Sequence, residues 1–423
     1  MTAVVATTRS GGPATKARPV GPLTKDQAAA RDRAERVILR RRAQAVLHHD
    51  RAAWMADLDN SDAGFVAEQK QVYDNLSQLT FTTWRYEPIG RDYNRPDLAA
   101  KYPGEPYHLP AVLLHYAIKG YDVAPVARPE VLTFVRHRHR WLLASDTDGD
   151  QDLPPTGHAD PWDRRAMVTG RGKHVLVLAD AQDRSRLSAV VRVADASVSR
   201  VADMWPTGWR RKVVVVAVRD QQLIETYFRT DLQSSENVAA VAVPAFDYVP
   251  GWSTSTGAAP AKSRSRVIIN PRYFDPTDAF NQNLLTHEIT HVATQGETFR
   301  GAPTWLVEGA AEYTAYRSQG APANVGLTPK LRKEVSTGSV TLPTYDFYQG
   351  DVGGHYVTGR LACSLIARDY GEAKLRAVYA RLGRVTDEAL TIQAQDQVFH
   401  RMLGTTEAAF EKRLATYIGQ VGR

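Results

Sequence analysis

Cysteine is almost absent from the sequence, since the 423-residue chain contains only Cys363. An intrachain disulfide and a metal site built from several cysteines are therefore both excluded. Cys363 lies in the apolar run 361–366, which predicts a buried side chain without a chemical role.

Long apolar segments are also missing. The longest uninterrupted ones span Val213 to Val218 and Val238 to Val243, whereas a membrane-spanning helix needs roughly 20 apolar residues. The N-terminal residues contain no apolar stretch of about 7 to 15 residues, which a secretion signal requires. We therefore expect no transmembrane segment. As written, the chain is expected to be cytoplasmic, and export or membrane tethering would require a natural start further upstream.

The excess of one charge sign is small. The chain has 53 basic and 46 acidic residues, a formal net charge of +7 spread over 423 residues. Proteins that bind nucleic acids usually gather their basic residues in a patch or a motif. A nucleic-acid partner is therefore not expected, and the hydrophobic content of 43% is that of an ordinary globular chain.

The pattern along the chain divides it into four parts, which we take as 1–25, 26–146, 147–162 and 163–423. The first is rich in Gly and Pro and predicts a disordered tail. In the second, helices from residue 26 and over 65–76 precede extended segments at 79–86, 111–118 and 131–144, which predicts a small α+β accessory domain. This element order resembles the cone-shaped fold of nuclear transport factor 2. The third part is acidic and proline-rich and predicts a linker.

The fourth part, 163–423, is expected to combine a mixed sheet with a helical lobe, so the whole chain is assigned to the α+β class. Strand-like runs lie at 174–178, 188–193, 212–218 and 238–245, with a helical stretch at 195–205 among them. From Pro276 onward the pattern is wholly helical.

Within this helical region, the segment 287–291 reads His-Glu-Ile-Thr-His. His287 and His291 are four residues apart, so both imidazoles emerge from one side of a helix and can bind the same Zn²⁺ ion. Glu288 is rotated away from them and can reach a water molecule without binding the metal. Two histidines on a helix are often only surface or hydrogen-bonded groups, so a third ligand is needed to support the assignment.

That third ligand is predicted to be Glu308, in the segment 305–313, Trp-Leu-Val-Glu-Gly-Ala-Ala-Glu-Tyr. Pro303 suits the first turn of a helix, from which Glu308 and Glu312 project on the same face. In this scheme Glu308 binds zinc, and Glu312 accepts a hydrogen bond from the outer nitrogen of a ligand histidine. A plain surface carboxylate is the alternative for Glu312.

The two motifs together resemble the gluzincin metallopeptidases, in particular the peptidase MA-like group related to the aminopeptidase N family. The resemblance covers about residues 162–423 and implies a thermolysin-like catalytic domain, in which the edge strand of a sheet holds the substrate and zinc lies between the sheet and a helical lobe. It also implies a tyrosine that stabilises the tetrahedral intermediate. Tyr356 is our candidate, because it precedes Gly359 and the apolar helix that this glycine is expected to open. His355 and Tyr348 are alternatives.

One departure from the aminopeptidase pattern affects the expected substrate. Those enzymes bind the free amine of the substrate through a Gly-Ala-Met-Glu-Asn element, and nothing in this chain matches it. The corresponding region, 263–271, is expected to be the edge strand. Cleavage within a chain, or of an unusual substrate, is thus expected as much as aminopeptidase action.

The motifs and the resemblance together predict a zinc metallopeptidase acting on a peptide or protein, with Glu288 as general base and, as the resemblance implies, Tyr356 as oxyanion donor. Two alternatives stay open. One is a peptide-binding protein with little turnover, and the other is a zinc hydrolase acting on something other than peptides.

Overall fold

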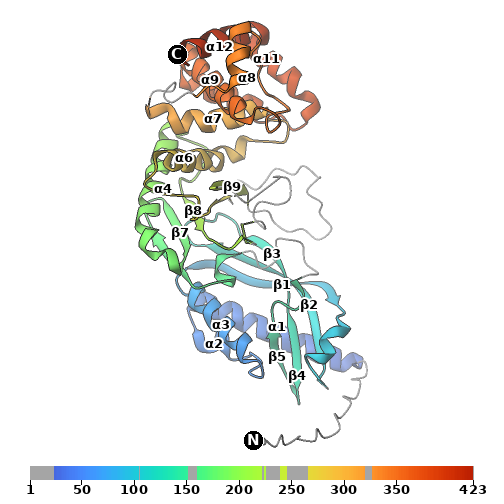
Figure 1. Cartoon of the computed structure of the whole chain (residues 1–423). Coiled ribbons are helices and arrows are strands. Elements are labelled where there is room, and N and C mark those ends of the chain that lie inside the picture. The colour runs from blue at the N-terminus through green and yellow to red at the C-terminus, as the bar shows by residue number, and fades with distance from the viewer. Residues whose placement is uncertain are drawn as a thin grey trace, which may run out of the picture.

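The computed structural model describes residues 23–103, 105–150, 160–221, 223–224, 239–244, 265–319 and 326–422. These residues form helices and two separate sheets, which confirms the α+β class. Figure 1 shows the N-terminal sheet at the bottom, the second sheet in the middle and the C-terminal helices at the top. The expected tail, 1–25, lies outside the described residues up to residue 22, and so does the expected linker from 151 to 159.

The N-terminal part has helices first and strands afterward, in the predicted order. Its helices are α1 (Lys25–His48), α2 (Arg51–Met55) and α3 (Ala63–Leu76). Its strands are β1 (Phe81–Tyr93), β2 (Tyr107–Ile118), β3 (Val126–Val131), β4 (Thr133–His137) and β5 (Arg140–Ser145). All the strand pairs are antiparallel, in the order β1-β2-β4-β5, with β3 also paired to β2. Helix α1 begins where Thr24 and Gln27 form a reciprocal capping box.

The second sheet is mixed. Its elements are β6 (Met167–Arg171), β7 (Val175–Asp180), α4 (Arg184–Met204), β8 (Val213–Ala217), β9 (Ala240–Pro244) and β10 (Ser265–Ile269). The strand order is β6-β7-β8-β10-β9. The three central strands run parallel, and each edge strand is antiparallel to its neighbour.

Two sequence predictions for this region are wrong. Residues 188–193 are not a strand but lie in the first half of α4. Their β-branched side chains favour a strand locally, but Val190, Ala194, Val198 and Val201 are buried at helical spacing, so packing against the sheet determines the structure. The segment 263–271 is not the edge strand either, because β10 lies between β8 and β9 and the edge position is taken by β9.

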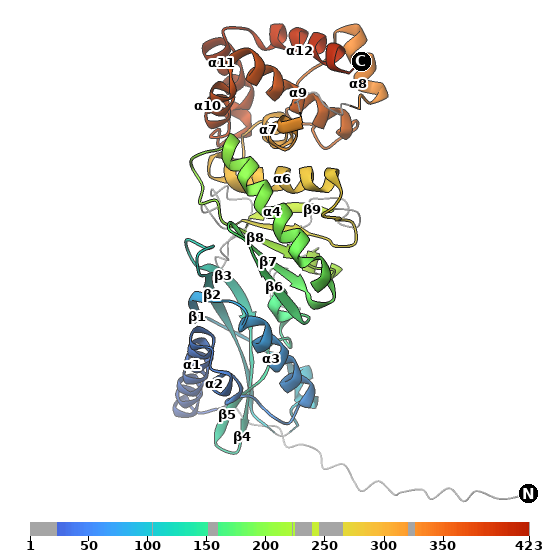
Figure 2. The ribbon, with the colours of Figure 1, turned by 90° about the vertical axis from the view of Figure 1, so that its left-hand side faces the viewer.

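From residue 276 onward, the regular elements of the described segments are all helical, as predicted. The α-helices are α6 (Ala279–Thr294), α7 (Thr304–Tyr316), α8 (Pro329–Thr337), α9 (Val352–Tyr370), α10 (Glu372–Leu382), α11 (Thr391–Leu403) and α12 (Glu407–Val421). In Figure 2, α4 crosses the second sheet and α6 lies between that sheet and the upper helices. None of the described helices combines the length and hydropathy needed to cross a membrane.

Both faces of the second sheet are buried. On one face, Val177 and Val215 pack with α4 and α6 in the cluster that continues into the C-terminal helices. On the opposite face, Leu176 and Val214 belong to a cluster with Trp84 of β1 and other residues of the N-terminal part. The two parts of the chain, separated in our sequence prediction by a linker, therefore share a hydrophobic core.

A buried ion pair reinforces this junction. Asp122, in the turn after β2, lies 2.7 Å from a guanidinium nitrogen of Arg266 on β10, and both side chains are almost fully inaccessible. Trp162 packs edge-to-face against Tyr116 of β2 and is 1% exposed. The last residue of the expected linker is thus part of the junction.

Candidate metal centre

The three residues of the His-Glu-x-x-His segment are presented by α6. Asp278 caps the N-terminus of this helix by accepting a hydrogen bond from the backbone N–H of Phe280. Leu285 and Ile289 are fully buried on its core face. This burial fixes the rotation of α6 and turns His287 and His291 toward α7, as the helical spacing predicted.

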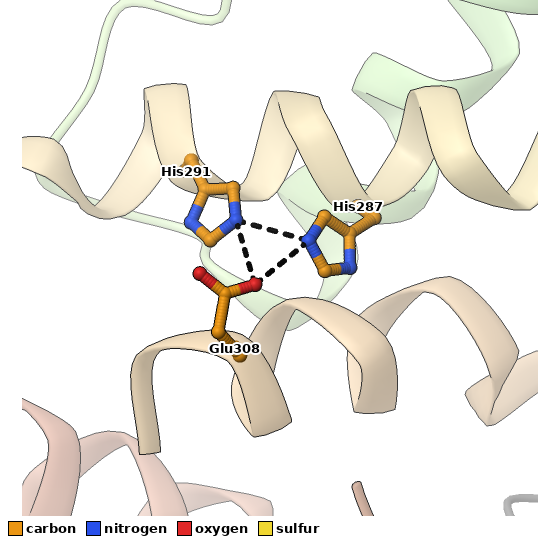
Figure 3. Close-up of side chains that lie close together, drawn as sticks. All are labelled: His287, His291 and Glu308. Atoms are coloured by element: carbon orange, nitrogen blue, oxygen red, sulfur yellow. Dashed lines mark hydrogen bonds and ion pairs between the residues drawn. The ribbon is translucent and has the colours of Figure 1, made fainter. Parts of the chain in front are cut away.

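Helix α7 supplies the third predicted ligand, Glu308, opposite the histidine pair (Figure 3). The Nε2 atoms of His287 and His291 are 3.0 Å apart, and the Oε2 atom of Glu308 lies 3.2 Å and 3.6 Å from them, respectively. Ligand atoms at 2.0–2.1 Å from a tetrahedral ion are about 3.3 Å from each other. The observed separations bracket this value, so the three donors fit a zinc-sized ion, and they form the one group of this kind within the described residues.

His287 and Glu308 stabilise each other in their charged forms. Burial opposes the positive charge of His287, yet hydrogen bonds with the carboxylates of Glu308 and Glu312 raise its pKa well above the ordinary value. Burial also opposes the negative charge of Glu308, but His291 and His287 hold its pKa well below the ordinary value. Because a histidine must be deprotonated to bind a metal, an ion that bound at this site would displace a proton.

Two neighbours orient the predicted ligands. Oε1 of Glu312 is 3.0 Å from Nδ1 of His287, which directs Nε2 of that ring toward the cluster. This contact is the one expected for Glu312. The hydroxyl of Tyr348 donates to Oε1 of Glu308 across 2.7 Å, which leaves Oε2 facing the histidines.

Glu288 is held by the edge strand of the sheet. It is 7% exposed, and its Oε2 accepts a hydrogen bond from the backbone N–H of Ala242 across 2.6 Å. Ala242 lies at the centre of β9, opposite Val267 of β10. Its N–H is directed to Glu288 and so away from the sheet, as the free side of an edge strand allows.

The three candidates for the oxyanion donor differ in their contacts. Tyr356 of α9 packs edge-to-face against Phe347 and has its ring 6.1 Å from that of His287. Burial and the nearby carboxylate of Glu308 raise the pKa of Tyr356, so its hydroxyl stays protonated at neutral pH. Tyr348 is engaged with Glu308 as described above. Nδ1 of His355 lies 2.8 Å from the carbonyl oxygen of Phe347.

A close helix crossing brings α7 and α9 together at this centre. A Cβ atom on Gly309 would lie 2.3 Å from the carbonyl oxygen of Gly359, and one on Gly359 would lie 2.7 Å from that of Trp305. Gly359 does not open α9, as the sequence analysis expected, because the helix begins at Val352 with Asp351 as its cap. Its role is to let the two helices touch, which places Tyr356 beside the predicted ligands.

One residue that the sequence analysis did not identify is Arg360, whose guanidinium group interacts electrostatically with Glu312. Its side chain is buried on α9, with the guanidinium carbon 4.5 Å from the ring centre of Tyr316. Burial lowers the pKa of Arg360, and the negative charge of Glu312 acts in the opposite sense. Its Nε has no hydrogen-bond partner among the described residues. An arginine inside the otherwise apolar run of α9 was the available signal.

Cys363 lies deeper in α9 and is fully buried, as predicted. Burial raises the pKa of its thiol, which keeps it unreactive.

The site is thus built from α6, α7, α9 and β9. No protein-family model matches the chain, and a comparison with curated proteins gives no match either.

Proposed function

We propose that this chain is a zinc-dependent metallopeptidase of the gluzincin type, which hydrolyses peptide bonds. The supporting observation is the convergence of three donor atoms, 3.0–3.6 Å apart, beside a buried carboxylate that is not one of them. The ligand triangle alone would serve a structural metal equally well. The position of Glu288, between the histidine helix and the edge strand, favours catalysis.

In this proposal His287, His291 and Glu308 hold zinc, which when bound supplies a Lewis acid that polarises a carbonyl group and acidifies a water molecule. Glu288 accepts the proton of the attacking water and delivers it to the leaving amine. The N–H of Ala242 holds Oε2 of Glu288, so the proton is taken by Oε1. Tyr356 donates a hydrogen bond to the oxyanion that forms on the carbonyl.

The peptide would lie along β9. An extended peptide can add to the free side of an edge strand through backbone hydrogen bonds, and the centre of β9 is already in contact with Glu288. We propose on this basis a thermolysin-like arrangement for residues 163–423. For the N-terminal part we propose a likeness to nuclear transport factor 2, supported by three helices followed by a sheet of antiparallel strands.

Cleavage of an unfolded protein such as reduced casein tests the proposal. The zinc-loaded protein should cut it within the chain, and a chelator should stop the reaction until zinc is returned. Binding of casein without cleavage would instead support a peptide-binding protein. If the zinc-loaded protein neither binds nor cuts peptides, the result would support the remaining alternative, a zinc hydrolase that acts on another substrate.

A further inference from the structure

A cavity of about 320 Å³ lies where the N-terminal part meets the second sheet. The turn between β2 and β3 contributes Tyr121 and Val123 to its wall, and the segment before β8 contributes Trp209, Arg210 and Lys212. In Figure 1, β3 lies at the end of the N-terminal part that is nearest to the second sheet. Two sections of chain, about 90 residues apart, therefore close one pocket.

Helix α6 connects this cavity with the metal centre. Val292 and Ala293, which directly follow His291, form part of its wall. Val292 is four residues after Glu288, so it lies on the same face of α6, one turn further along. One turn of helix rises about 5.4 Å, which an extended peptide covers in roughly two residues.

The register of the sheet relates β9 to the cavity wall. Ala242, whose N–H holds Glu288, is followed by Val243, and Val243 lies opposite Arg266 of β10. Arg266 is itself part of the cavity wall. Because β9 ends one residue after Val243, the cavity lies near this end of the sheet, and a peptide aligned with β9 that continues past the end of the strand would approach it within a few residues of the bond that is cut.

The wall of the cavity is positively charged. Arg210 is exposed and Lys212 is half-buried, with its Nζ 5.7 Å from the ring centre of Tyr121 and 2.6 Å from the carbonyl oxygen of Lys173. Arg266 is neutralised by Asp122, at 2.7 Å and 2.9 Å. Among the described residues, the wall contains no carboxylate to neutralise Arg210 and Lys212.

We propose that this cavity is a substrate subsite that binds a peptide carboxylate, supplied by an Asp or Glu side chain within about three residues of the scissile bond. The apolar residues Val214 and Val292 in its wall would accept the methylene groups of such a side chain, while Arg210 and Lys212 bind its charge. The inference rests on the proposed peptidase function. It also gives the N-terminal part a role, because Tyr121 and Val123 complete the subsite.

Binding can be tested without turnover, using the zinc-loaded Glu288→Gln protein. The probes are unstructured peptides of identical sequence except for one Glu or Gln, placed in turn at each of several positions, all with amidated C-termini. We expect the best Glu peptide to bind at least tenfold more tightly than its Gln counterpart in calorimetry at low salt. The difference should shrink as the ionic strength rises.

Variants of the cavity wall identify where the charge is recognised. The double variant Arg210→Ala with Lys212→Ala should lose the preference for Glu. A control of equal charge, Lys70→Ala with Arg401→Ala, removes exposed side chains from α3 and α11 and should keep it. Thermal melting of both variants checks that the fold is intact, and Arg210→Glu, at an exposed position, provides a second test with the same expected loss.

Equal binding of the Glu and Gln peptides, or a preference that survives in the double variant, would overturn the subsite. If tight binding appears only when the peptides carry a free C-terminal carboxylate, the recognised group is the chain end and not a side chain. This result would also overturn the proposal. The proposed function is judged separately, by cleavage of the same peptides by the wild-type protein. Retained Glu preference without any cleavage would reject the peptidase activity and keep the binding site.

Discussion

The backbone N–H of Ala242 donates a hydrogen bond to Oε2 of Glu288 across 2.6 Å, joining the edge strand β9 to the helix that carries both histidines. The two residues are 46 positions apart in the chain. This contact holds the carboxylate of Glu288 where its charge acts on His287. In the proposed function it also marks where an extended substrate would lie. The proposed function depends on this pairing of sheet edge and metal centre.

Loss of a predicted ligand should abolish zinc binding. His287→Ala and Glu308→Ala each leave two ligands, which do not complete a tetrahedral site. Metal analysis after dialysis should find about one zinc per wild-type chain and almost none in either variant. Stoichiometric zinc in both variants would show that the ligands are other residues.

Glu312 should affect affinity instead of stoichiometry. Glu312→Gln keeps the shape of the side chain but removes the charge that orients His287, and such changes cost about 10- to 100-fold in metal affinity. Competition with a zinc indicator measures this. An affinity equal to wild type would mean that Glu312 is a plain surface carboxylate.

The oxyanion donor can be identified by comparing three variants. Tyr356→Phe should lower kcat by roughly 10² to 10³ with little change in KM, because one transition-state hydrogen bond is lost and ground-state contacts remain. Tyr348→Phe should act mainly on zinc affinity, since its hydroxyl orients Glu308. His355→Ala should act mainly on stability, through its contact with the carbonyl oxygen of Phe347. A collapse of kcat in either of these, with Tyr356→Phe unaffected, would reject Tyr356.

The crossing of α7 and α9 should not tolerate an added methyl group. Gly359→Ala would place Cβ 2.7 Å from the carbonyl oxygen of Trp305, and overpacking of this kind costs about 1–3 kcal/mol. The melting temperature and the zinc affinity should both fall. Gly353→Ala is the matched control, because it lies on the exposed side of the same helix and its Cβ would meet only a side-chain carbon of Thr328 at 3.6 Å. The control should be neutral or slightly stabilising, and equal losses in both variants would contradict the close crossing.

Several parts of the site could be predicted because they are local. His287, Glu288 and His291 lie on one helix, so their spacing determines which side chains share a face. Glu308 could be predicted because its motif accompanies the first one. The contacts of Gly309 with Gly359, and of Ala242 with Glu288, join segments distant in sequence, and no local pattern specifies them.

The two wrong predictions about the fold also arise from contacts between segments that are distant in sequence. The valine-rich segment 188–193 has the composition of a strand, but burial against the second sheet makes it part of α4. The order β8-β10-β9 depends on which strand pairs with which, so the edge strand could not be read from hydropathy. The hydrophobic core shared by the N-terminal part and residues 163–423 could not be predicted either. An acidic, proline-rich segment indicates a linker, but it does not indicate whether the parts on its two sides are in contact.

The most direct test of the proposed function compares wild type with Glu288→Gln, both loaded with zinc, in the casein cleavage assay. Glutamine can still accept the hydrogen bond from Ala242, so fold and zinc content should be unchanged while the proton acceptor is lost. We predict that wild type cleaves, that chelation stops it, and that Glu288→Gln is slower by a factor on the order of 10² or more. Cleavage by Glu288→Gln at a rate near that of wild type, with equal zinc content, would contradict the account.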